Sequence, residues 1–134
     1  MAYANKTKVP VDRSRAEVER LIHRHGCTKY GSAVDYETGK VRLQFNAQSR
    51  IIRIEMDMPK GEQATRAKWR ALVLVLKAKL EAVESKISTF EEEFMPFIVL
   101  PDDRTVGQHM KPAIASMYST GKMPAGYLGA GEAK

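Results

Sequence analysis

The sequence predicts an α+β fold: an N-terminal helix, a three-stranded antiparallel meander, a long central helix packed on the sheet, and one or two short C-terminal helices. Apolar residues recur with a helical period over residues 63–87 and with a period of two over residues 29–59. A chain of 134 residues with 43% hydrophobic content is sufficient for one ordinary core. We therefore expect a single domain over residues 13–121, with a flexible arm at 1–12 and a flexible tail at 122–134.

The segment 63–87 has the longest helical pattern in the chain. At 100° per residue it is apolar on two sides, one broad and one made of smaller residues. The broad face holds Trp69, Leu72, Val73, Leu76, Leu80, Val83 and Ile87, and the small-residue face holds Ala71, Leu74, Val75, Ala78 and Ala82. We expect the broad face to pack on the sheet. The small-residue face then needs the C-terminal helices or a second subunit as cover.

The capping-box pattern, in which Ser or Thr precedes Glu or Gln by three residues, occurs before three other apolar segments and predicts three further helices. The pairs are Ser14 with Glu17, Thr89 with Glu92, and Thr105 with Gln108. We expect these helices to end at Gly26, near Phe97 and near Thr120, where Gly121 supplies a stop.

The last of these helices contains Pro112, which either kinks it or delays its start. Ile114, Met117 and Tyr118 form its apolar stripe. We expect this stripe to be buried, with the small-residue face of the central helix as its nearest counterpart.

The segment 29–59 alternates apolar and polar residues, which is typical of strands with one buried face. The inward rows are Tyr30, Ser32, Val34 and Tyr36, then Val41, Leu43 and Phe45, then Ile52, Ile54, Met56 and Met58. Residues 37–40 are typical of a turn with Gly39 at a positive φ, and the polar residues 47–49 link the second strand to the third. Connections this short favour an antiparallel meander covered by the central helix.

Positive charge is concentrated in the first part of the chain. Residues 1–80 hold 17 Lys and Arg and 8 Asp and Glu, whereas residues 81–134 hold 5 and 8. A basic segment suggests a polyanionic partner, most simply nucleic acid, while a basic surface also serves solubility alone. Both interpretations stay open because the sequence has no dense run of Lys or Arg.

Seven cations are the candidate nucleic-acid-binding residues, because they fall on the outward side of the strands or at the entrance of the central helix. They are Arg42, Arg50, Arg53, Lys60, Arg66, Lys68 and Arg70. Tyr30 and Tyr36 offer rings for base stacking if they lie on an open surface, and are otherwise half-buried edge residues. We favour single-stranded DNA as the ligand. A homo-oligomer through Ala71, Leu74 and Ala78 is a second association that the sequence suggests.

No catalytic signature accompanies the charge pattern. The sequence has no P-loop, no dinucleotide-binding glycine motif, no G-x-S-x-G and no H-E-x-x-H. His23, His25 and Cys27 come nearest to a metal cluster, but a closed zinc site needs four ligands. We therefore expect no enzyme, no metal and no cofactor.

Four carboxylates leave one enzymatic alternative, a small magnesium-dependent nuclease. They are Asp35, Glu37, Glu55 and Asp57, on neighbouring strands or turns. Cross-strand ion pairs with the nearby arginines are the simpler interpretation of the same residues.

The sequence also indicates a location. A single cysteine, Cys27, excludes an intramolecular disulfide and fits a reducing compartment. The N-terminus has no apolar signal region, and the longest apolar run, residues 71–76, is far shorter than the roughly 20 residues that span a bilayer. We expect a soluble protein of the cytoplasm that makes no membrane contact.

The order helix–strand–strand–strand–helix over residues 14–87 resembles that of double-stranded-RNA-binding domains. Residues 60–68 resemble the basic start of that family's second helix, which grips phosphates across a groove. The family's histidine loop between strands one and two has no counterpart, because the turn 37–40 is too short. The strand–strand–strand–helix portion is also similar to the core of single-strand annealing proteins, which act as rings or filaments. Both likenesses are topological.

As a whole, residues 13 to about 124 resemble small proteins encoded by bacteriophages and prophages. The stretches concerned are RSRAEVERLIHRHG, KWRALVLVLKAKLEAVESKISTFEEEF and IVLPDDRTVGQHMKPAI. The resemblance implies a bacterial host cytoplasm and a phage-related role, and it carries no activity or site residues. We expect a non-enzymatic nucleic-acid-binding accessory protein of replication or recombination. The alternatives are the nuclease and an interaction module that binds and inhibits or redirects a host protein.

Overall fold

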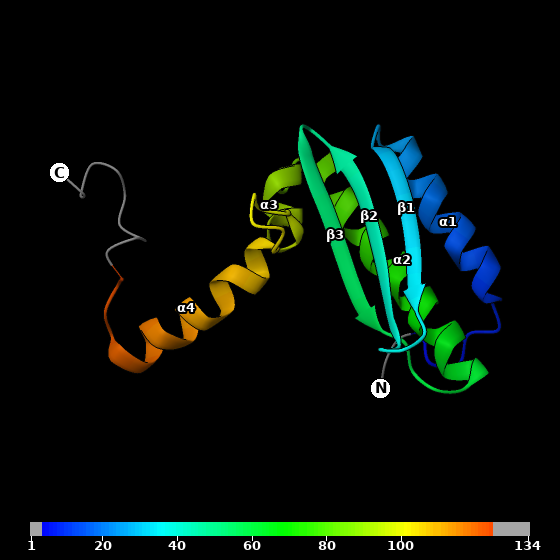
Figure 1. Ribbon diagram of the computed structural model, residues 1–134. Helices are drawn as coiled ribbons and strands as arrows, with labels where there is room; N and C mark the ends of the chain where they lie inside the picture. The colour runs from blue at the N-terminus through cyan, green and yellow to red at the C-terminus, as the bar shows by residue number, and fades with distance from the viewer. Residues whose placement is uncertain (1–3, 125–134) are drawn as a thin grey trace.

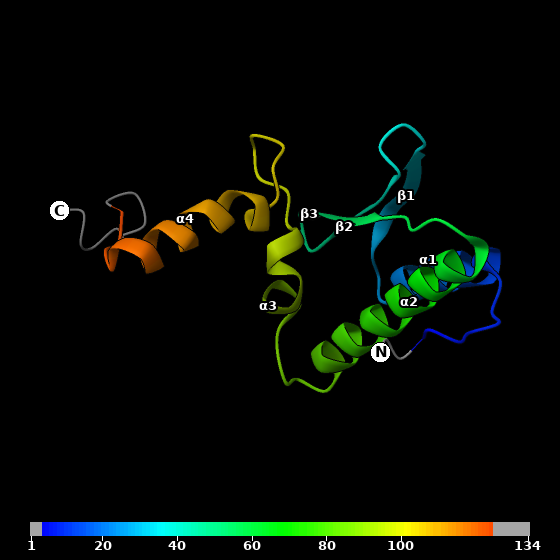
Figure 2. The ribbon, with the colours of Figure 1, turned by 90° about the horizontal axis from the view of Figure 1, so that it is seen from below.

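Two helices cover one face of a three-stranded antiparallel sheet, and the other face is open (Figures 1 and 2). The computed structural model describes residues 4–124. In chain order the elements are α1 (Val11–Arg24), β1 (Thr28–Asp35), β2 (Lys40–Ala47), β3 (Arg50–Asp57), α2 (Glu62–Glu84), α3 (Phe90–Phe94), the 3-10 helix η1 (Met95–Phe97) and α4 (Val106–Thr120). The expected α+β class and its order of elements are confirmed.

The sheet has the strand order β1-β2-β3, and its register places the apolar rows on the covered face. Leu43 pairs with Ser32 on one side and with Ile54 on the other, and Phe45 pairs with Ile52. Leu43, Phe45 and Ile52 are at most 1% exposed. Because successive side chains of a strand point to opposite faces, the polar residues between them lie on the open face.

Helix α2 lies on the sheet through the broad apolar face that its pattern predicts. Trp69, Val73, Leu76 and Leu80 are no more than 4% exposed. They recur at the spacing that places side chains on one side of a helix, so one face of α2 completes the core.

Helix α1 packs beside α2 on the same face of the sheet, and the two helices run in the same direction. Near their starts, Arg70 donates to the hydroxyl of Ser14 over 3.1 Å. Near their ends, His25 Nε2 lies 3.7 Å from the carboxylate of Glu84. Between them Val18 is fully buried. The two helices thus form a continuous second layer.

Residues 90–105 return the chain to the free edge of β3. Phe94, which is fully buried, stacks on Phe90 with ring centroids 4.5 Å apart and meets Phe45 edge-on at 6.1 Å. The amide of Val99 then donates to the carbonyl of Ile51 over 2.8 Å. α4 therefore begins at the β3 side of the sheet, away from α1.

Helix α4 projects away from the rest of the molecule (Figures 1 and 2). Its start is the expected capping box of Thr105 and Gln108. No side chain of α4 is buried; Ile114 is 46% exposed and Tyr118 is 88% exposed. The expectation that Ile114, Met117 and Tyr118 are buried, against the small-residue face of α2, is wrong.

The cause lies at the root of α4. The amide of Val106 donates to the carbonyl of Ile98 over 2.9 Å. Gly107 lies so close to Pro96 that a Cβ there would stand 3.0 Å from the Pro96 carbonyl oxygen. These contacts attach the start of α4 to the β3 edge, whereas the small-residue face of α2 points away from the sheet. A helix attached in this way does not reach that face of its own α2.

Two helix boundaries differ from their predictions. α1 begins at Val11 after Pro10, with no side-chain cap, because the hydroxyl of Ser14 is fully buried and bonded to Arg70. The capping box predicted at Ser14 is therefore wrong. The helix begins four residues earlier than predicted. Ser14 therefore lies in the α1–α2 interface and not at the start of the helix.

Helix α2 ends at Glu84, three residues before the predicted end, and Ile87 is 80% exposed. Lys86 takes a left-handed φ of 60°, and the amide of Ile87 donates back to the carbonyl of Ala82 over 2.9 Å. This is the hydrogen bond of a Schellman motif, in which glycine is the usual residue. Because this position holds a lysine and not a glycine, the sequence does not indicate that the helix ends here.

The N-terminal arm is partly fixed where the structure describes it. Gln63 donates to the carbonyls of Asn5 and Thr7 over 3.2 and 2.8 Å, and Ala4 is only 5% exposed. Residues 1–3 of the expected arm and 125–134 of the expected tail lie outside the described residues.

Candidate nucleic-acid interface

The seven candidate cations fall into two groups, five arginines with carboxylate partners and two lysines without. The nitrogen–oxygen distances are 3.1 Å for Arg42–Glu55, 3.0 Å for Arg50–Glu91, 2.7 Å for Arg53–Asp103, 2.8 Å for Arg66–Glu62 and 2.9 Å for Arg70–Glu17. Lys60 and Lys68 are exposed and form no hydrogen bond or ion pair with any residue of 4–124. Among the seven candidates, the charge that remains available to a ligand therefore lies at the entrance of α2.

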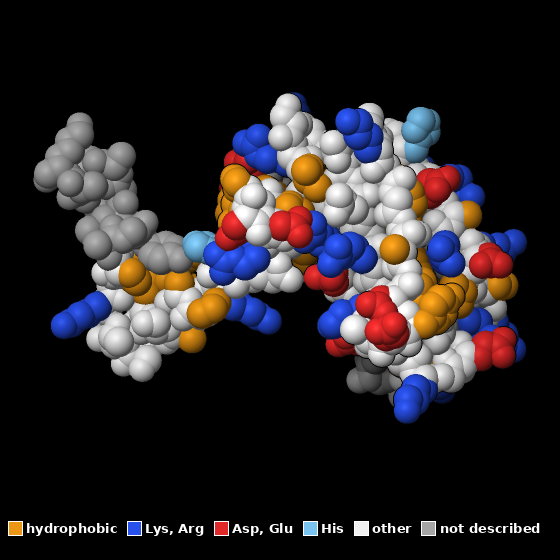
Figure 3. Space-filling view, viewed as in Figure 1, with side chains coloured by type: hydrophobic (Ala, Val, Ile, Leu, Met, Phe, Trp, Pro, Cys, Tyr) orange, Lys and Arg blue, Asp and Glu red, His pale blue; other side chains and the backbone are white. Residues whose placement is uncertain are grey.

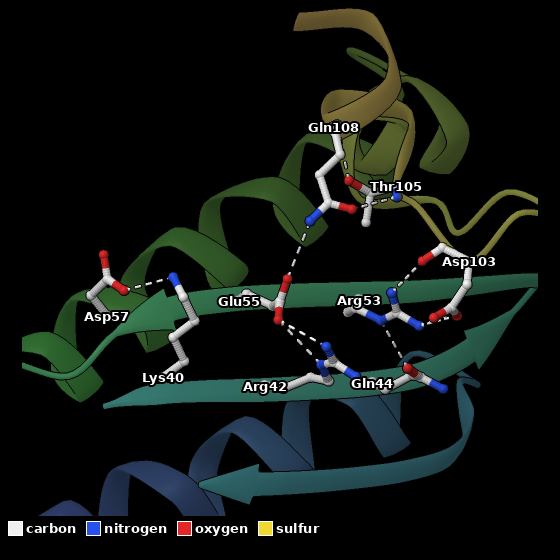
Figure 4. A network of polar contacts seen from close by, with 9 residues as sticks. All are labelled: Lys40, Arg42, Gln44, Arg53, Glu55, Asp57, Asp103, Thr105 and Gln108. Carbon is white, nitrogen blue, oxygen red and sulfur yellow. Dashed lines mark hydrogen bonds and ion pairs between the residues drawn. The ribbon is translucent and has the colours of Figure 1, made fainter. Parts of the chain in front are cut away.

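The open face of the sheet carries cross-strand ion pairs (Figure 4). Lys40 is opposite Asp57, and their Nζ and Oδ1 atoms are 2.9 Å apart. Arg42 is opposite Glu55 and donates to it through both Nε and Nη2. The hydrogen bond from Lys40 lowers the pKa of Asp57. This face therefore carries both signs of charge side by side, with no broad patch of one sign (Figure 3).

Arg53 has a structural role. Its side chain is 7% exposed and donates to Gln44 over 3.2 Å, to the Asp103 carbonyl over 2.8 Å and to the Asp103 carboxylate over 2.7 Å. Gln108, at the first turn of α4, reaches Glu55 on the same strand over 3.4 Å. Arg53 thus ties the turn before α4 to the sheet (Figure 4), and its guanidinium is not free for a phosphate.

Arg70 lies in the interface between α1 and α2. It donates to Ser14 over 3.1 Å and to Glu17 over 2.9 Å, and Lys77 approaches the other oxygen of Glu17 at 2.8 Å. The hydrogen bonds from Lys77 and Arg70 lower the pKa of Glu17. Only 15% of the Arg70 side chain is exposed, so it joins two helices and does not present its charge to solvent.

The β1–β2 turn and the segment that leads from β3 into α2 lie at the same end of the sheet. Tyr36, in this turn, is 90% exposed. Asp35 fixes the turn by accepting two backbone amides over 2.9 and 3.2 Å, which lowers its pKa. The carbonyl of Gly39 accepts from the amide of Met58 over 2.7 Å. This bond places the turn beside the segment that contains Lys60.

Lys68 belongs to the same end, since its charge contributes, after Lys40, to lowering the pKa of Asp57 at the end of β3. We call Tyr36, Lys60 and Lys68 the turn-end cluster. Tyr30, the other tyrosine considered, packs against the core, and burial raises its pKa. Tyr30 thus fits the half-buried interpretation and Tyr36 the exposed one.

Three arginines of α1 were not among the candidates, yet they too lack partners within residues 4–124. They are Arg13, Arg20 and Arg24. Arg20 and Arg24 line a shallow groove between α1 and α2, with Leu21 and Lys77. The sequence shows that Arg20 and Arg24 share a helix face, but it does not show that Glu17 is engaged by α2 and leaves them unpaired.

Within residues 4–124, the carboxylates of the nuclease alternative do not come together as a metal site. Asp35 caps its own turn, Glu55 is bonded to Arg42, and Asp57 is bonded to Lys40. Across residues 4–124 no three His, Cys, Asp or Glu side chains come together as metal ligands. Cys27 is buried, which raises its pKa and disfavours the reactive thiolate.

No helix within residues 4–124 is long and apolar enough to cross a membrane. No protein-family model, curated protein or solved structure matches the chain. The helix–strand–strand–strand–helix order expected from the double-stranded-RNA-binding likeness is present over residues 11–84, but topology alone assigns no ligand.

Proposed function

We propose that the protein binds nucleic acid, with a preference for single strands, through the turn-end cluster. The proposal rests mainly on a tyrosine ring, 90% exposed, at the same end of the sheet as two exposed lysines that form no ion pair within the described part of the chain. Stacking of a base on an aromatic side chain contributes about 1–3 kcal/mol, and lysines bind backbone phosphates.

The preference for single strands follows from Tyr36. A ring that projects from a turn stacks on a base only if the base is out of a duplex, because the faces of paired bases are already stacked on their neighbours. Because the charges on the open face of the sheet are paired with one another, the binding site should be small and confined to one end of the molecule. A small site contacts few phosphates, so we expect a shallow salt dependence.

The biological setting that we propose is phage replication or recombination in a bacterial cytoplasm, in line with the phage-type resemblance of the sequence. An accessory role without catalysis agrees with the engagement of Asp35, Glu55 and Asp57 in structural bonds.

Fluorescence anisotropy with labelled single-stranded DNA, single-stranded RNA and duplex DNA, over a series of salt concentrations, tests the proposal. Tyr36→Ala should weaken single-strand binding about 5- to 150-fold, which is the loss of one stacked base. Lys60→Gln and Lys68→Gln should each weaken binding to every sequence alike and reduce the salt slope by up to about 0.7.

Lys86→Gln is the matched control, because it removes the same charge from an exposed position at the other end of α2. It should leave binding unchanged. Arg20→Gln with Arg24→Gln tests the α1 groove as a rival surface. Binding that is lost in this double variant but kept in Tyr36→Ala would refute the turn-end cluster, and so would the absence of binding to all three nucleic acids at low salt.

A further inference from the structure

Strand β1 forms one edge of the sheet and has β2 as its only neighbouring strand within residues 4–124. At the opposite edge the chain itself extends the sheet, because the amide of Val99 donates to the carbonyl of Ile51 and Ile98 bridges to Ile52. An edge strand presents a row of N–H and C=O groups that can pair with a further strand. The edge of β1 is therefore open to a strand from elsewhere.

The backbone hydrogen bonds of β2 show which residues of β1 face that edge. Lys40 is paired with Asp57, and just beyond this pair the amide of Met58 donates to the carbonyl of Gly39 over 2.7 Å. A bond in that position is typical of a non-hydrogen-bonded pair, so Lys40 turns its own N–H and C=O groups away from β3 and toward β1. Lys40 and Asp35, its partner on β1, are then a hydrogen-bonded pair.

The direction of these backbone groups alternates along a strand. Ala33, two residues before Asp35, therefore also faces β2. Ser32 and Val34 turn their N–H and C=O groups outward, and neither has a backbone hydrogen bond to a loop or helix of residues 4–124. The irregular register of β1 is confined to residues 28–31, and residues 30–34 contain no charge and no proline, which commonly protect an edge.

Helix α1 lies below and beside this edge and makes a groove with it (Figures 1 and 2). Arg15 of α1 donates to the hydroxyl of Ser32 over 3.3 Å. Nearer the start of β1, a hollow between the two elements is lined by Ile22, Cys27 and Tyr30 together with Glu19 and Lys29. Beside β3, the apolar side chain of Ile98 is buried in the core on the helix side of the sheet. An added strand at β1 would place alternate side chains in the groove in the same way.

The charges that border the edge have both signs. Arg15 and Lys29 are positive, whereas Glu19 and Asp35 are negative. They select neither a polyanion nor a strongly acidic or basic peptide. Recognition at this edge therefore depends on the backbone groups and on the apolar part of the groove.

A single extended strand fits this edge better than a second copy of the chain. Two copies joined through β1 would be related by a two-fold axis between strands about 4.8 Å apart. Because α1 lies below and outside β1, that axis would bring both α1 helices under the joined strands (Figures 1 and 2). They would then lie closer together than the about 8–10 Å that packed helices need.

We propose that the free edge of β1 binds an extended peptide segment of a partner protein, which adds a fourth strand to the sheet. Ser32 and Val34 exchange backbone hydrogen bonds with this segment, and its alternate side chains, which are apolar, enter the groove beside α1. The proposal goes beyond nucleic-acid binding and does not rest on it, since it uses the edge of β1 and not the turn-end cluster.

Selection of random ten-residue peptides from a displayed library, on the immobilised full chain, tests the proposal. Selected peptides should carry apolar residues at alternate positions. Ser32→Pro removes an outward N–H group and should weaken the binding of a selected peptide at least about 10-fold, because a peptide carbonyl loses its donor. Ser32→Ala, which loses only the hydroxyl, is the matched control and should bind like the wild type. Circular dichroism and thermal unfolding establish that both variants are folded.

N-methylation of a selected peptide gives a test that leaves the protein unchanged. A methyl group on every second amide should abolish binding, whereas methylation of the amides in between should have little effect, since only alternate residues of an added strand face β1. Equal sensitivity of all positions would overturn strand addition. A library that yields no peptide dependent on the Ser32 N–H group would overturn it as well.

Two further measurements separate this proposal from its alternatives. Light scattering that shows a wild-type dimer, lost in Ser32→Pro but kept in Ser32→Ala, would overturn the proposal in favour of a second copy at the edge. Ser32→Pro should leave the binding of single-stranded DNA unchanged, and Tyr36→Ala should leave peptide binding unchanged. The failure of one proposal is therefore distinguishable from the failure of the other.

Discussion

The module α1–β1–β2–β3–α2 and helix α4 carry the same kind of amphipathic pattern, but only the module buries it. Leu43 and Phe45 in β2 are at most 1% exposed, whereas Ile114 and Tyr118 in α4 are 46% and 88% exposed. The pattern of a segment says that one face needs cover, but not which surface supplies it. In the module the cover lies within the chain, whereas no residue of 4–124 buries the apolar face of α4.

The largest expected effect tests the difference between the module and α4 directly. Phe45→Ala should lower the free energy of unfolding by about 3–5 kcal/mol, because it opens a cavity between the sheet and Phe94. Ile114→Ala should lower it by only about 0.5 kcal/mol when the protein is dilute, since Ile114 is already 46% exposed. Chemical denaturation monitored by circular dichroism measures both. Equal losses would show that α4 packs on its own domain.

The polar contact inside the module comes next. Glu17→Gln removes a carboxylate held by Arg70 and Lys77 and should lower the free energy of unfolding by about 1–3 kcal/mol at neutral pH. Its pKa is lowered in the folded state from an ordinary value of 4.5, so the unfolded state takes up a proton first as the pH falls. The stabilisation is therefore complete above about pH 4.5 and is lost as the pH drops through the folded-state pKa.

Denaturation of wild type and Glu17→Gln at a series of pH values reads out this dependence. The difference between the two proteins should be largest near neutral pH and should shrink in acid. Glu19→Gln, at an exposed position on the same helix, is the control and should show no such dependence. A constant difference at all pH values would mean that the Glu17 carboxylate is not what joins α1 to α2.

A smaller effect is expected at the root of α4. Arg53→Met removes three hydrogen bonds, two of which tie the turn before α4 to β3, and should cost about 1–2 kcal/mol, since part of the network is solvated. Hydrogen exchange should quicken in residues 98–106 and remain unchanged in the strands. Arg50→Met, which removes an exposed pair with Glu91, should change neither quantity measurably.

The local signals of the sequence were sufficient where the deciding contacts are local. The capping boxes at Thr89 and Thr105 form as predicted because both partners lie within one helical turn. The box at Ser14 does not, because Arg70, 56 residues away, takes the hydroxyl. The prediction that the α4 stripe is buried was wrong for the same reason. Contacts outside the helix, with Pro96 and the β3 edge, set the direction of α4.

The candidate site shows the same division. Arg42 and Arg53 lie on the outward strand face as expected. The expectation is wrong for Arg50, which shares the face of Ile52 and Ile54 and bonds to Glu91 of α3. Two of the partners of these arginines, Glu91 and Asp103, lie 41 and 50 residues away. No spacing rule reveals such pairs. Lys60 and Lys68 form no ion pair within residues 4–124, although the Asp57 carboxylate attracts Lys68, and only the folded chain shows this.

The smallest expected effect distinguishes the turn-end cluster from the charged pair Arg50–Glu91 at the other end of β3. It depends on the proposed binding role of the turn-end cluster. Asp57→Asn removes the carboxylate that faces Lys40 and attracts Lys68, so it should leave both cations free for phosphates. Its pKa is lowered, so the carboxylate is ionised at neutral pH and its removal adds positive charge there. Single-strand affinity should rise and the salt slope should steepen by up to about 0.7. Glu91→Gln frees Arg50 at the far end of β3 and should change neither. If both variants strengthen binding equally, net charge controls the affinity and position does not, and a confined site at the turn end is wrong.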